Sequence, residues 1–374
     1  MPARASIRDV ATLAGISVST VSNLLNGRPN RMRSDTVLRI EEAIERLGYK
    51  PNRSARSLKT GFTPAIGLLV PSVANPFHGA MAHAVEVAAQ ARGFQIVLGN
   101  TLRDAARERQ CAGDFFAFGV RGVIATSSPF DLEHFKDLIG RGLSVVALDM
   151  VNSNADAKLA MDSVSMDNYR AGYLATQHLI DLGHRRIGYV SGATPTMSRR
   201  DRLNGYKAAL LAAKIKPDPV LIAAGESASG YDDIHAAEHG RSATLSLLTL
   251  PDPPSALVAL NDMHAVGACA AVREIGCTVP NHVSVVGIDD INLAALLYPP
   301  LTTVRHPVKP LSDAAVDLLV KRIEGQERGP SRQIVFEPTL VVRGSTAPCA
   351  KTKANLGKSQ LTRSAVNVWG NSRA

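Results

Sequence analysis

The chain has 374 residues, of which 45% are hydrophobic, so it is long enough for two or three domains with proper cores. Its four cysteines are widely spaced and form no CxxC pair or Cys/His cluster, which argues against a disulfide scaffold or a zinc site. The chain opens without a charged-then-apolar leader, and its apolar runs are too short to span a bilayer. We therefore expect a cytoplasmic protein without a membrane partner.

The net charge of +9 is unevenly distributed along the chain. Residues 1–61 carry 11 Lys and Arg against 5 Asp and Glu, and residues 347–374 carry 5 against none. The body, residues 62–346, carries 26 against 28. Positive charge at the ends favours nucleic-acid binding there and not on the body.

The first helical pattern begins after Ser6 and ends at Gly15. Ser6 can accept a hydrogen bond from the backbone N–H three residues on, and Asp9 can reach back to Ser6, which is a capping box. Gly15 suits a sharp turn, because glycine adopts backbone angles that other residues avoid. The apolar face of this helix is expected to comprise Val10, Ala11, Leu13 and Ala14.

A second helical pattern follows the turn, with Ile16 as a plug in the core and Ser17 as its cap. Its inward side chains are expected to be Val21, Leu24 and Leu25. Its outer face carries mostly short polar side chains, namely Val18, Ser19, Ser22 and Asn23. Two helices joined by a tight glycine turn, with such an outer face, form a helix-turn-helix, whose second helix fits the DNA major groove.

In isolation this pattern also fits an ordinary helical hairpin inside a larger fold. A third helix is expected from a Ser34 cap to a Gly48 stop, with Val37, Ile40, Ile44 and Leu47 on one face. The next stretch, residues 49–61, is basic and too short to bury a core. A compact positive three-helix unit followed by a basic segment favours phosphate binding.

At this point the sequence resembles the lac repressor family of bacterial transcription regulators. The resemblance is carried by IRDVATLAGISVSTVSNLLNG (residues 7–27) and AIERLGYKPNRSARSLKTG (residues 43–61), and it extends over about residues 6–346. It implies an α-helical helix-turn-helix DNA-binding domain in residues 1–48 and a hinge helix in residues 49–61. Residues 62–346 would form an α/β two-lobed, periplasmic-binding-protein-like (type I) effector and dimerisation domain.

The resemblance also implies how the DNA is contacted. Val18, Ser19 and Asn23 occupy positions that face base edges in the family, where relatives commonly carry arginine in place of Asn23. Arginine reads guanine, whereas asparagine suits adenine. Leu58 of the hinge would wedge open a base step in the minor groove, although the hinge is too short to be helical alone and would be a flexible linker off DNA. The expected phosphate and hinge contacts are Ser17, Thr20, Ser22, Asn26, Arg28, Arg33, Tyr49, Asn52, Ala55 and Arg56.

Strand and helix patterns alternate through the body. Near-continuous β-branched runs between helices indicate parallel strands buried on both faces, and their number requires two α/β subdomains. The resemblance places crossovers near Asp162, Asn292 and Glu324. It thus implies an N-lobe of about residues 62–162 and 292–324 and a C-lobe of about 163–291 and 325–346. By resemblance only, helices at residues 76–92 and 265–275 are candidates for the dimer interface.

Ligands of open α/β sheets bind at the carboxyl ends of the strands. The loops there carry carboxylates, an asparagine, an arginine and an aromatic ring, a set that suits a polyhydroxylated ligand. The candidate effector residues are Ser72, Asn75, Phe77, His78, Thr126, Asp149, Thr196, Ser198, Arg202, Asn261, Asp289 and His306. Four of these, Asp149, Arg202, Asn261 and Asp289, align with effector-contacting positions of the family.

Some strand-end residues have a structural alternative. Phe77 fits a pocket wall and a lobe core equally well, and His78 and His306 match pocket positions only in some relatives. Asp262 and Asp290 are expected to be structural, because a strand-end aspartate often caps a helix. His184 is interpreted as a structural residue at the entry of a strand.

The sequence thus predicts a DNA-binding transcription regulator, most often a repressor, of the bacterial cytoplasm and nucleoid. It would bind a pseudopalindromic operator as a homodimer and respond to a small-molecule effector, a sugar or sugar derivative, without a cofactor or metal. The alternatives are a sugar-binding transport protein and an enzyme acting on a sugar. The first needs no DNA-binding head, and the GxSxG, HExxH and GxGxxG motifs of the second are not found. Residues 347–374, basic and without leucine heptads, are expected to be a disordered tail that gives no reason for a tetramer.

Overall fold

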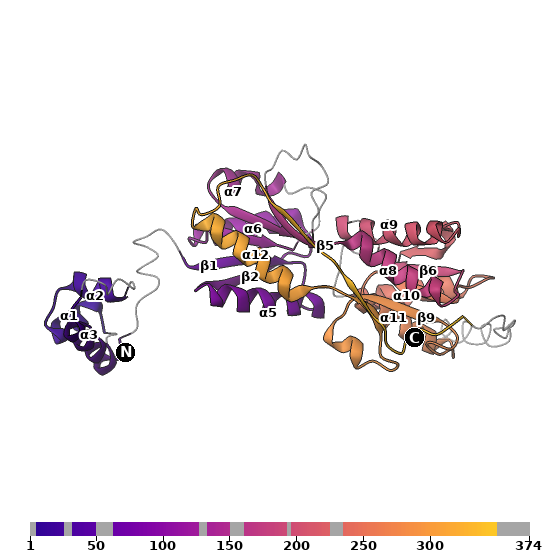
Figure 1. Cartoon of the computed structure of the whole chain (residues 1–374), viewed down its shortest axis with the longest axis horizontal. Coiled ribbons are helices and arrows are strands. Elements are labelled where there is room, and N and C mark those ends of the chain that lie inside the picture. Colours follow the sequence, from indigo (N-terminus) through magenta and orange to yellow (C-terminus); the bar gives the residue numbers. More distant parts are fainter. Residues whose placement is uncertain are drawn as a thin grey trace, which may run out of the picture. The chain divides into compact units, whose positions relative to one another are not determined.

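A computed structural model of the chain describes residues 5–25, 32–49, 63–126, 133–149, 161–192, 196–224 and 235–349. The chain divides into two compact units, Met1–Thr63 and Pro64–Ala374, coloured by sequence in Figure 1. Within the described ranges, no helix is both long and apolar enough to cross a membrane.

The first unit contains three helices, α1 (Ile7–Ala14), α2 (Val18–Leu25) and α3 (Ser34–Leu47). The predicted capping box is confirmed, because the Ser6 amide donates to Asp9 Oδ2 at 2.7 Å and the Asp9 amide donates to Ser6 Oγ at 3.4 Å. Gly15 ends α1 in the left-handed region, with φ of 66°. The core of the unit consists of Val10, Ala11, Ala14, Val21, Ile40 and Ala43, all buried.

Two details predicted for this unit are wrong. Leu13 is 43% exposed, because the buried face of α1 passes through Val10, Ala11 and Ala14 and leaves Leu13 at its side. Ser34 is the first residue of α3 and does not cap it, since Arg33 holds the N-cap position without a side-chain bond. The other predicted features hold: Ser17 Oγ accepts from the Thr20 amide at 3.2 Å, and Ile16 packs against the core.

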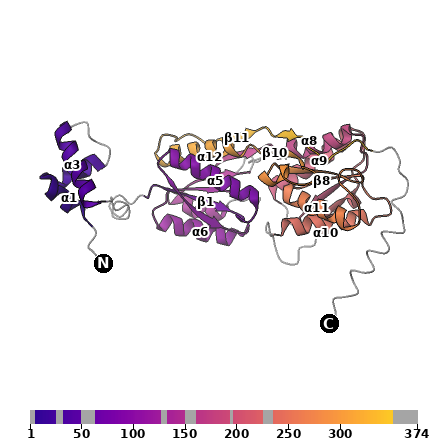
Figure 2. The ribbon, with the colours of Figure 1, turned by 90° about the horizontal axis from the view of Figure 1, so that it is seen from below.

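The first lobe of the second unit is built on a parallel six-stranded sheet in the order β11-β5-β4-β3-β1-β2. Helices α5 (Pro76–Ala91) and α12 (Val308–Ile323) pack together on one face, and α6 (Ala105–Ala117) and α7 (Lys136–Gly140) lie on the other (Figure 1, Figure 2). A short 3-10 helix, η1 (Glu133–Phe135), precedes α7. The strands are β1 (Ala65–Val70), β2 (Gln95–Asn100), β3 (Gly122–Ala125), β4 (Ser144–Leu148), β5 (Asp162–Met166) and β11 (Gln333–Phe336).

The second lobe repeats this architecture in the order β12-β10-β9-β8-β6-β7, with β12 antiparallel to β10. Helices α8 (Asn168–Asp181) and α9 (Met197–Ala212) cover one face, and α10 (Ala236–Leu248) and α11 (Asp262–Glu274) cover the other. Two 3-10 helices, η2 (Pro219–Leu221) and η3 (Asn292–Ala295), lie in its connections. The strands are β6 (Ile187–Ser191), β7 (Ile222–Ala224), β8 (Ala256–Ala259), β9 (Ser284–Asp289), β10 (Thr302–Arg305) and β12 (Thr339–Val341).

The fold class is the predicted one, but the predicted crossover positions are wrong. The chain passes from the first sheet to the second after β5, returns after β10, and crosses again between β11 and β12. The crossings expected near Asp162, Asn292 and Glu324 therefore assigned β5, β10 and β11 to the wrong lobe. The N-lobe contains β5 and β11 with α12, whereas the C-lobe contains β10.

The boundaries of the predicted tail and hinge also differ in detail. Residues 347–349 belong to the C-lobe, because the Ala347 amide donates to Ser284 Oγ at 3.1 Å and the Cys349 amide donates to the Leu182 carbonyl at 2.8 Å. Tyr49, counted with the hinge, packs against the core of the first unit. Residues 350–374 of the tail and 50–61 of the hinge lie outside the described residues.

Helices α8 and α9 touch each other through glycine. A Cβ on Gly172 would lie 2.0 Å from the carbonyl oxygen of Arg202, and one on Gly205 would lie 2.0 Å from that of Tyr169. Helices α10 and α11 cross in the same way at Gly267. No other residue type permits such an approach of two backbones, so these glycines fix the spacing of both helix pairs.

We expect Gly172→Ala to lower the free energy of unfolding by about 1–3 kcal/mol or more, because the added Cβ forces α8 and α9 apart. The matched control is Gly113→Ala in α6, where an added Cβ meets nothing within 4 Å, and which should be neutral or stabilising by about 0.4–1 kcal/mol. Urea unfolding of both variants provides the measurement. Equal stability of the Gly172→Ala variant and the parent protein contradicts the interpretation.

Candidate functional site

The outer face of α2 carries the side chains predicted to reach base edges. Val18 is 40% exposed, and Ser19 and Asn23 are also exposed. Ser17 Oγ lies 2.7 Å from Ser19 Oγ and 2.8 Å from Thr20 Oγ1, so three hydroxyl groups gather where the helix begins. Ser22 is half-buried and Arg33 is exposed at the start of α3. The predicted contacts Asn26, Arg28, Asn52, Ala55, Arg56 and Leu58 lie outside the described residues.

A cavity lies where the strands of both lobes end. It contains about 490 Å³ of space between side chains, part of it open to solvent. It faces the positions where the strand order reverses, between β1 and β3 in the first sheet and between β6 and β8 in the second, which is where such sheets bind ligands. Nine of the twelve candidate effector residues line it: Asn75, Phe77, His78, Thr126, Asp149, Ser198, Arg202, Asn261 and Asp289.

Three helices begin at this cavity. Asn75 caps α5 by accepting from the Phe77 amide at 3.1 Å, and Asn261 caps α11 by accepting from the His264 amide at 3.0 Å. Thr196 caps α9, whose first-turn residue Ser198 lines the cavity. Because a helix carries partial positive charge at its N-terminus, the three helices make the cavity electropositive.

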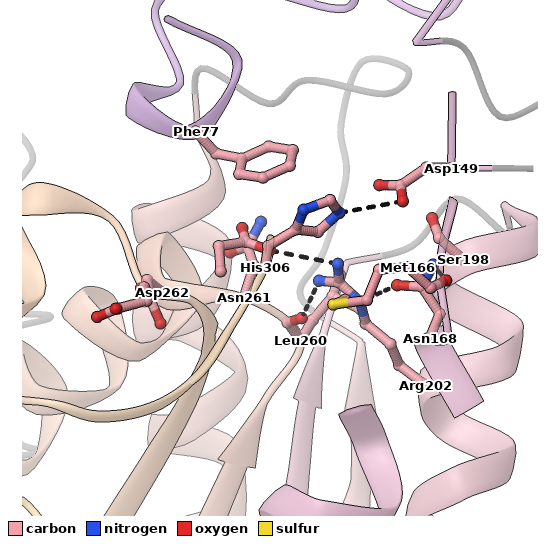
Figure 3. A network of polar contacts seen from close by, with 12 residues as sticks. Phe77, Asp149, Met166, Asn168, Ser198, Arg202, Leu260, Asn261, Asp262 and His306 are labelled. Atoms are coloured by element: carbon pink, nitrogen blue, oxygen red, sulfur yellow. Dashed lines mark hydrogen bonds and ion pairs between the residues drawn. The ribbon is translucent and has the colours of Figure 1, made fainter. Parts of the chain in front are cut away.

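Arg202 holds the second-lobe side of the cavity together. Its Nε donates to Asn168 Oδ1 at 2.8 Å, its Nη1 to the Leu260 carbonyl at 2.8 Å, and its Nη2 to Asp289 Oδ1 at 3.2 Å (Figure 3). Arg202 and Asp289 are only 6% and 5% exposed. Burial raises the pKa of the Asp289 carboxyl, and the Arg202 guanidinium opposes this shift. The predicted residues therefore meet as a buried, hydrogen-bonded ion pair.

A histidine–aspartate contact joins the two lobes at the cavity. His306, which follows β10, donates from Nε2 to Asp149 Oδ1, which follows β4, at 3.1 Å (Figure 3). Burial alone would raise the pKa of Asp149, but the charge and hydrogen bond of His306, together with Arg202, hold that pKa well below its usual range. The ring of Phe77 packs edge-on against His306, with ring centroids 4.9 Å apart. Phe77 is thus both a wall of the cavity and a contact between the lobes.

Three of the candidate effector residues do not line the cavity. His306 lies behind Asp149 and Phe77, and Thr196 caps α9. Ser72 is buried, and its Oγ accepts from the Ala74 amide at 3.2 Å in the turn after β1. These three support the lining residues.

Sequence reasoning missed five lining residues: Met81, Arg103, Leu148, Arg199 and Leu260. Arg103 follows β2 and Arg199 lies in the first turn of α9, so a search of every strand end and helix start for charged residues could have found both. Leu148 and Leu260 are apolar strand ends, which nothing distinguishes from core residues. Met81 lies one helical turn beyond Phe77.

The strand-end residues predicted to be structural are indeed held within the C-lobe. Asp262 accepts from Thr303 Oγ1 at 2.6 Å, and Asp290 pairs with Arg343 at 2.6 Å. The ring nitrogens of His184 both have partners within 3.1 Å. Burial, followed by the charge of neighbouring Asp289, raises the pKa of Asp262 well above its ordinary value.

Backbone strain concentrates around the cavity. Five of the six non-glycine residues with positive φ in the described ranges lie at the ends of β2, β4 and β9, and the sixth is Lys214. Three of the five, Arg103, Asp149 and Asp289, line the cavity. The left-handed region costs most L-residues roughly 1–2 kcal/mol, and such strain persists where the surrounding structure holds it, often at ligand sites.

We expect Arg202→Leu to lower the free energy of unfolding by about 3–5 kcal/mol near neutral pH, because it leaves the Asp289 carboxylate buried without its partner. Without the guanidinium the pKa of Asp289 rises further, so the folded protein binds the proton more tightly than the unfolded chain. Stability from a raised carboxyl pKa is present below the unfolded value of about 3.9 and is lost as pH rises through the folded value. The deficit should therefore shrink as the pH falls from 7 toward about 4.

Urea unfolding at a series of pH values measures this deficit. The double variant Arg202→Leu/Asp289→Asn is the control, since it removes both charges. It should lose less stability than the sum of the two single changes and should show no such pH dependence. A deficit of Arg202→Leu that is constant with pH argues against the assignment.

The chain is similar to DNA-binding repressors over most of its length. Residues 6–52 match the bacterial regulatory proteins of the lacI family, and residues 176–346 match a periplasmic binding protein-like domain. The ribose operon repressor of Haemophilus influenzae is 35% identical over 343 residues, which cover 91% of this chain and 98% of that protein. The repressor PurR of Haemophilus influenzae (strain PittEE) is 32% identical over 345 residues, with the same coverage. Among solved structures, the lac repressor dimer bound to operator and the anti-inducer ONPF has a TM-score of 0.79 at 26% identity, covering 92% of this chain and 100% of that one.

A helix-turn-helix unit, together with a two-lobed domain that has a polar cavity at its strand ends, defines a ligand-responsive transcription regulator. The chain belongs to the lacI family of bacterial regulatory proteins. It is a DNA-binding transcriptional repressor with an effector-binding domain, and it is not an enzyme.

Proposed function

We propose that this repressor binds a two-fold symmetric operator as a homodimer, and that a sugar or sugar derivative in the cavity switches this binding. The observation that carries the ligand assignment is the cavity lining. Asp149, Asn261 and Asp289 offer oxygen acceptors, and the ring of Phe77 offers an apolar face. Paired acceptors suit vicinal hydroxyl groups, and an aromatic ring suits the C–H face of a sugar. The relative named for the ribose operon supports the same ligand class.

The DNA contact is proposed on the outer face of α2. Val18, Ser19 and Asn23 are exposed there and would face base edges in the major groove. Phosphate contacts would come from Ser17, Thr20, Ser22 and Arg33, with Asn26 and Arg28 from the following loop. Hinge residues Tyr49, Asn52, Ala55, Arg56 and Leu58 would act in the minor groove once the hinge of a second subunit lies beside them.

The switch would operate through the spacing of the two hinges. An effector that binds both lobes favours a closed arrangement, because residues of both lobes line the cavity. Rotation of one lobe against the other then changes the separation of the hinges in a dimer, which helps or prevents their pairing. Helices α5 and α11 are the proposed dimer contacts, in line with the dimeric lac repressor structure.

The proposal is tested with duplexes selected from random sequence by the full-length protein. We expect a two-fold symmetric site whose affinity falls steeply with salt, because phosphate contacts release counterions. A sugar that changes operator affinity should have its own affinity changed by operator DNA by the same factor. Failure to find any salt-sensitive preference for a symmetric duplex, with or without a panel of sugars and nucleosides, overturns the proposal.

We expect Asn23→Arg to move the half-site preference from A·T toward G·C at one position, because arginine pairs with guanine and asparagine with adenine. Sequencing of the selected sites compares the variant with the parent protein. Arg33→Gln serves as the control, since loss of a phosphate contact should weaken binding to all sequences alike. An unchanged selected profile for Asn23→Arg refutes the base-reading role.

A further inference from the structure

Two arginines that the proposed sugar contacts do not use line the same cavity, one from each lobe. Arg103 follows β2 of the first lobe, and Arg199 lies in the first turn of α9 in the second. Neither is needed to hold the Arg202 network, whose hydrogen bonds go to Asn168, Leu260 and Asp289. We therefore asked which ligand chemistry would use them.

The backbone around Arg103 is shaped to direct this residue at the cavity. Leu102 and Arg103 both have positive φ, 52° and 56°, which is unfavourable for residues with a Cβ. The turn is fixed at one end, because the Thr101 and Leu102 amides donate to carbonyls at the end of β1, each at 2.9 Å. At the other end Asp104 caps α6 by accepting from the Arg107 amide at 2.9 Å. Such strain, held from both sides, is typical of residues that clamp a ligand.

Arg199 is placed with similar care beside the opposite sheet. Gly192, directly after β6, lies against its guanidinium, since a Cβ at Gly192 would meet Arg199 Nη1 at 2.9 Å. Only a residue without a side chain leaves this space to the arginine. Strand β6 borders the point where the strand order reverses, as β1 does in the first lobe. The two arginines are thus tied to corresponding strands of the two lobes.

The charges that line the cavity do not balance. Three arginines stand against two carboxylates, Asp149 and Asp289, and both carboxylates already contact a basic side chain. The N-termini of α5, α9 and α11 add partial positive charge at the same place. A neutral sugar would leave this positive excess in a partly enclosed space, whereas an anionic group would offset it.

We infer that the effector is an anionic sugar derivative, whose phosphate or carboxylate group is bound between Arg103 and Arg199. This inference rests on the proposed sugar-responsive function and narrows its ligand class. Guanidinium groups bind phosphate and carboxylate oxygens in the same bidentate way, so sugar phosphates and sugar acids share the required chemistry. The hydroxyl groups of the ligand would be held by Asp149, Asn261 and Asp289 on the far side of the anion.

The test uses the full-length protein and matched ligand pairs in thermal-shift and titration measurements. The probes are ribose with ribose 5-phosphate, glucose with glucose 6-phosphate and gluconate, and inorganic phosphate alone. We expect at least one anionic derivative to bind tenfold or more tightly than its neutral parent, with phosphate alone giving a weaker rise in melting temperature. The phosphate and gluconate arms distinguish a sugar phosphate from a sugar acid.

Variants identify the residues. Arg103→Gln and Arg199→Gln should each remove most of the preference for the anion, and Arg103→Lys and Arg199→Lys should keep part of it. Arg109→Gln and Arg200→Gln, exposed neighbours on α6 and α9 that do not line this cavity, are the matched controls and should keep all of it. Melting temperatures without ligand show whether each variant is folded.

The outcomes separate this inference from the proposed function. Equal or tighter binding of the neutral sugars, or an anion preference that survives both glutamine changes, overturns the inference and leaves the sugar-responsive function standing. A response to phosphate alone that depends on Arg103 and Arg199, with no response to any sugar, supports the anion site and argues against the sugar. No response to any anion overturns the inference.

Discussion

The structure of the second unit depends on the buried guanidinium of Arg202. Its three nitrogen atoms bind the first residue of α8, the carbonyl after β8 and the carboxylate at the end of β9, so one side chain joins three elements. A buried charge is tolerated only when its hydrogen bonds are satisfied, and here they are. Gly172 makes the arrangement possible, because it lets α8 lie against the Arg202 carbonyl at a distance that no Cβ permits. Helix packing and the charge at the cavity are therefore set by the same contact.

The cavity combines three features that each have a cost in stability. Positive φ angles at Arg103, Asp149 and Asp289 strain the backbone, burial raises the pKa of Asp289, and three helix N-termini concentrate positive charge. Each feature is offset locally, by a basic partner, by anchored turns or by a capping side chain. A site built in this way gains from a ligand that relieves the remaining positive charge, which is what a switch between two lobe arrangements needs.

Much of the fold and part of the site could be predicted from the sequence. The head followed from the capping box at Ser6 and the turn at Gly15, which are local features. The lobe boundaries could not be predicted, because β5 reads DSVSM and buries Ser163 and Ser165, so it lacks the apolar run that marks the other strands. Helices α10 and α12 were missed as well. Strand-end logic found nine lining residues, but it overlooked Arg103, whose direction depends on a pair of positive φ angles that a sequence pattern does not reveal.

The three crossings between the lobes have a consequence for how the protein is made. Neither lobe is a continuous stretch of chain, since the first sheet receives its edge strand from residues 333–336 and the second from residues 339–341. A ribosome must therefore synthesise nearly the whole polypeptide before either sheet can be completed. Until then β5 and β10 present unpaired edges, which are sites for wrong pairing and aggregation. The helix-turn-helix unit, by contrast, is continuous and can fold as soon as it emerges.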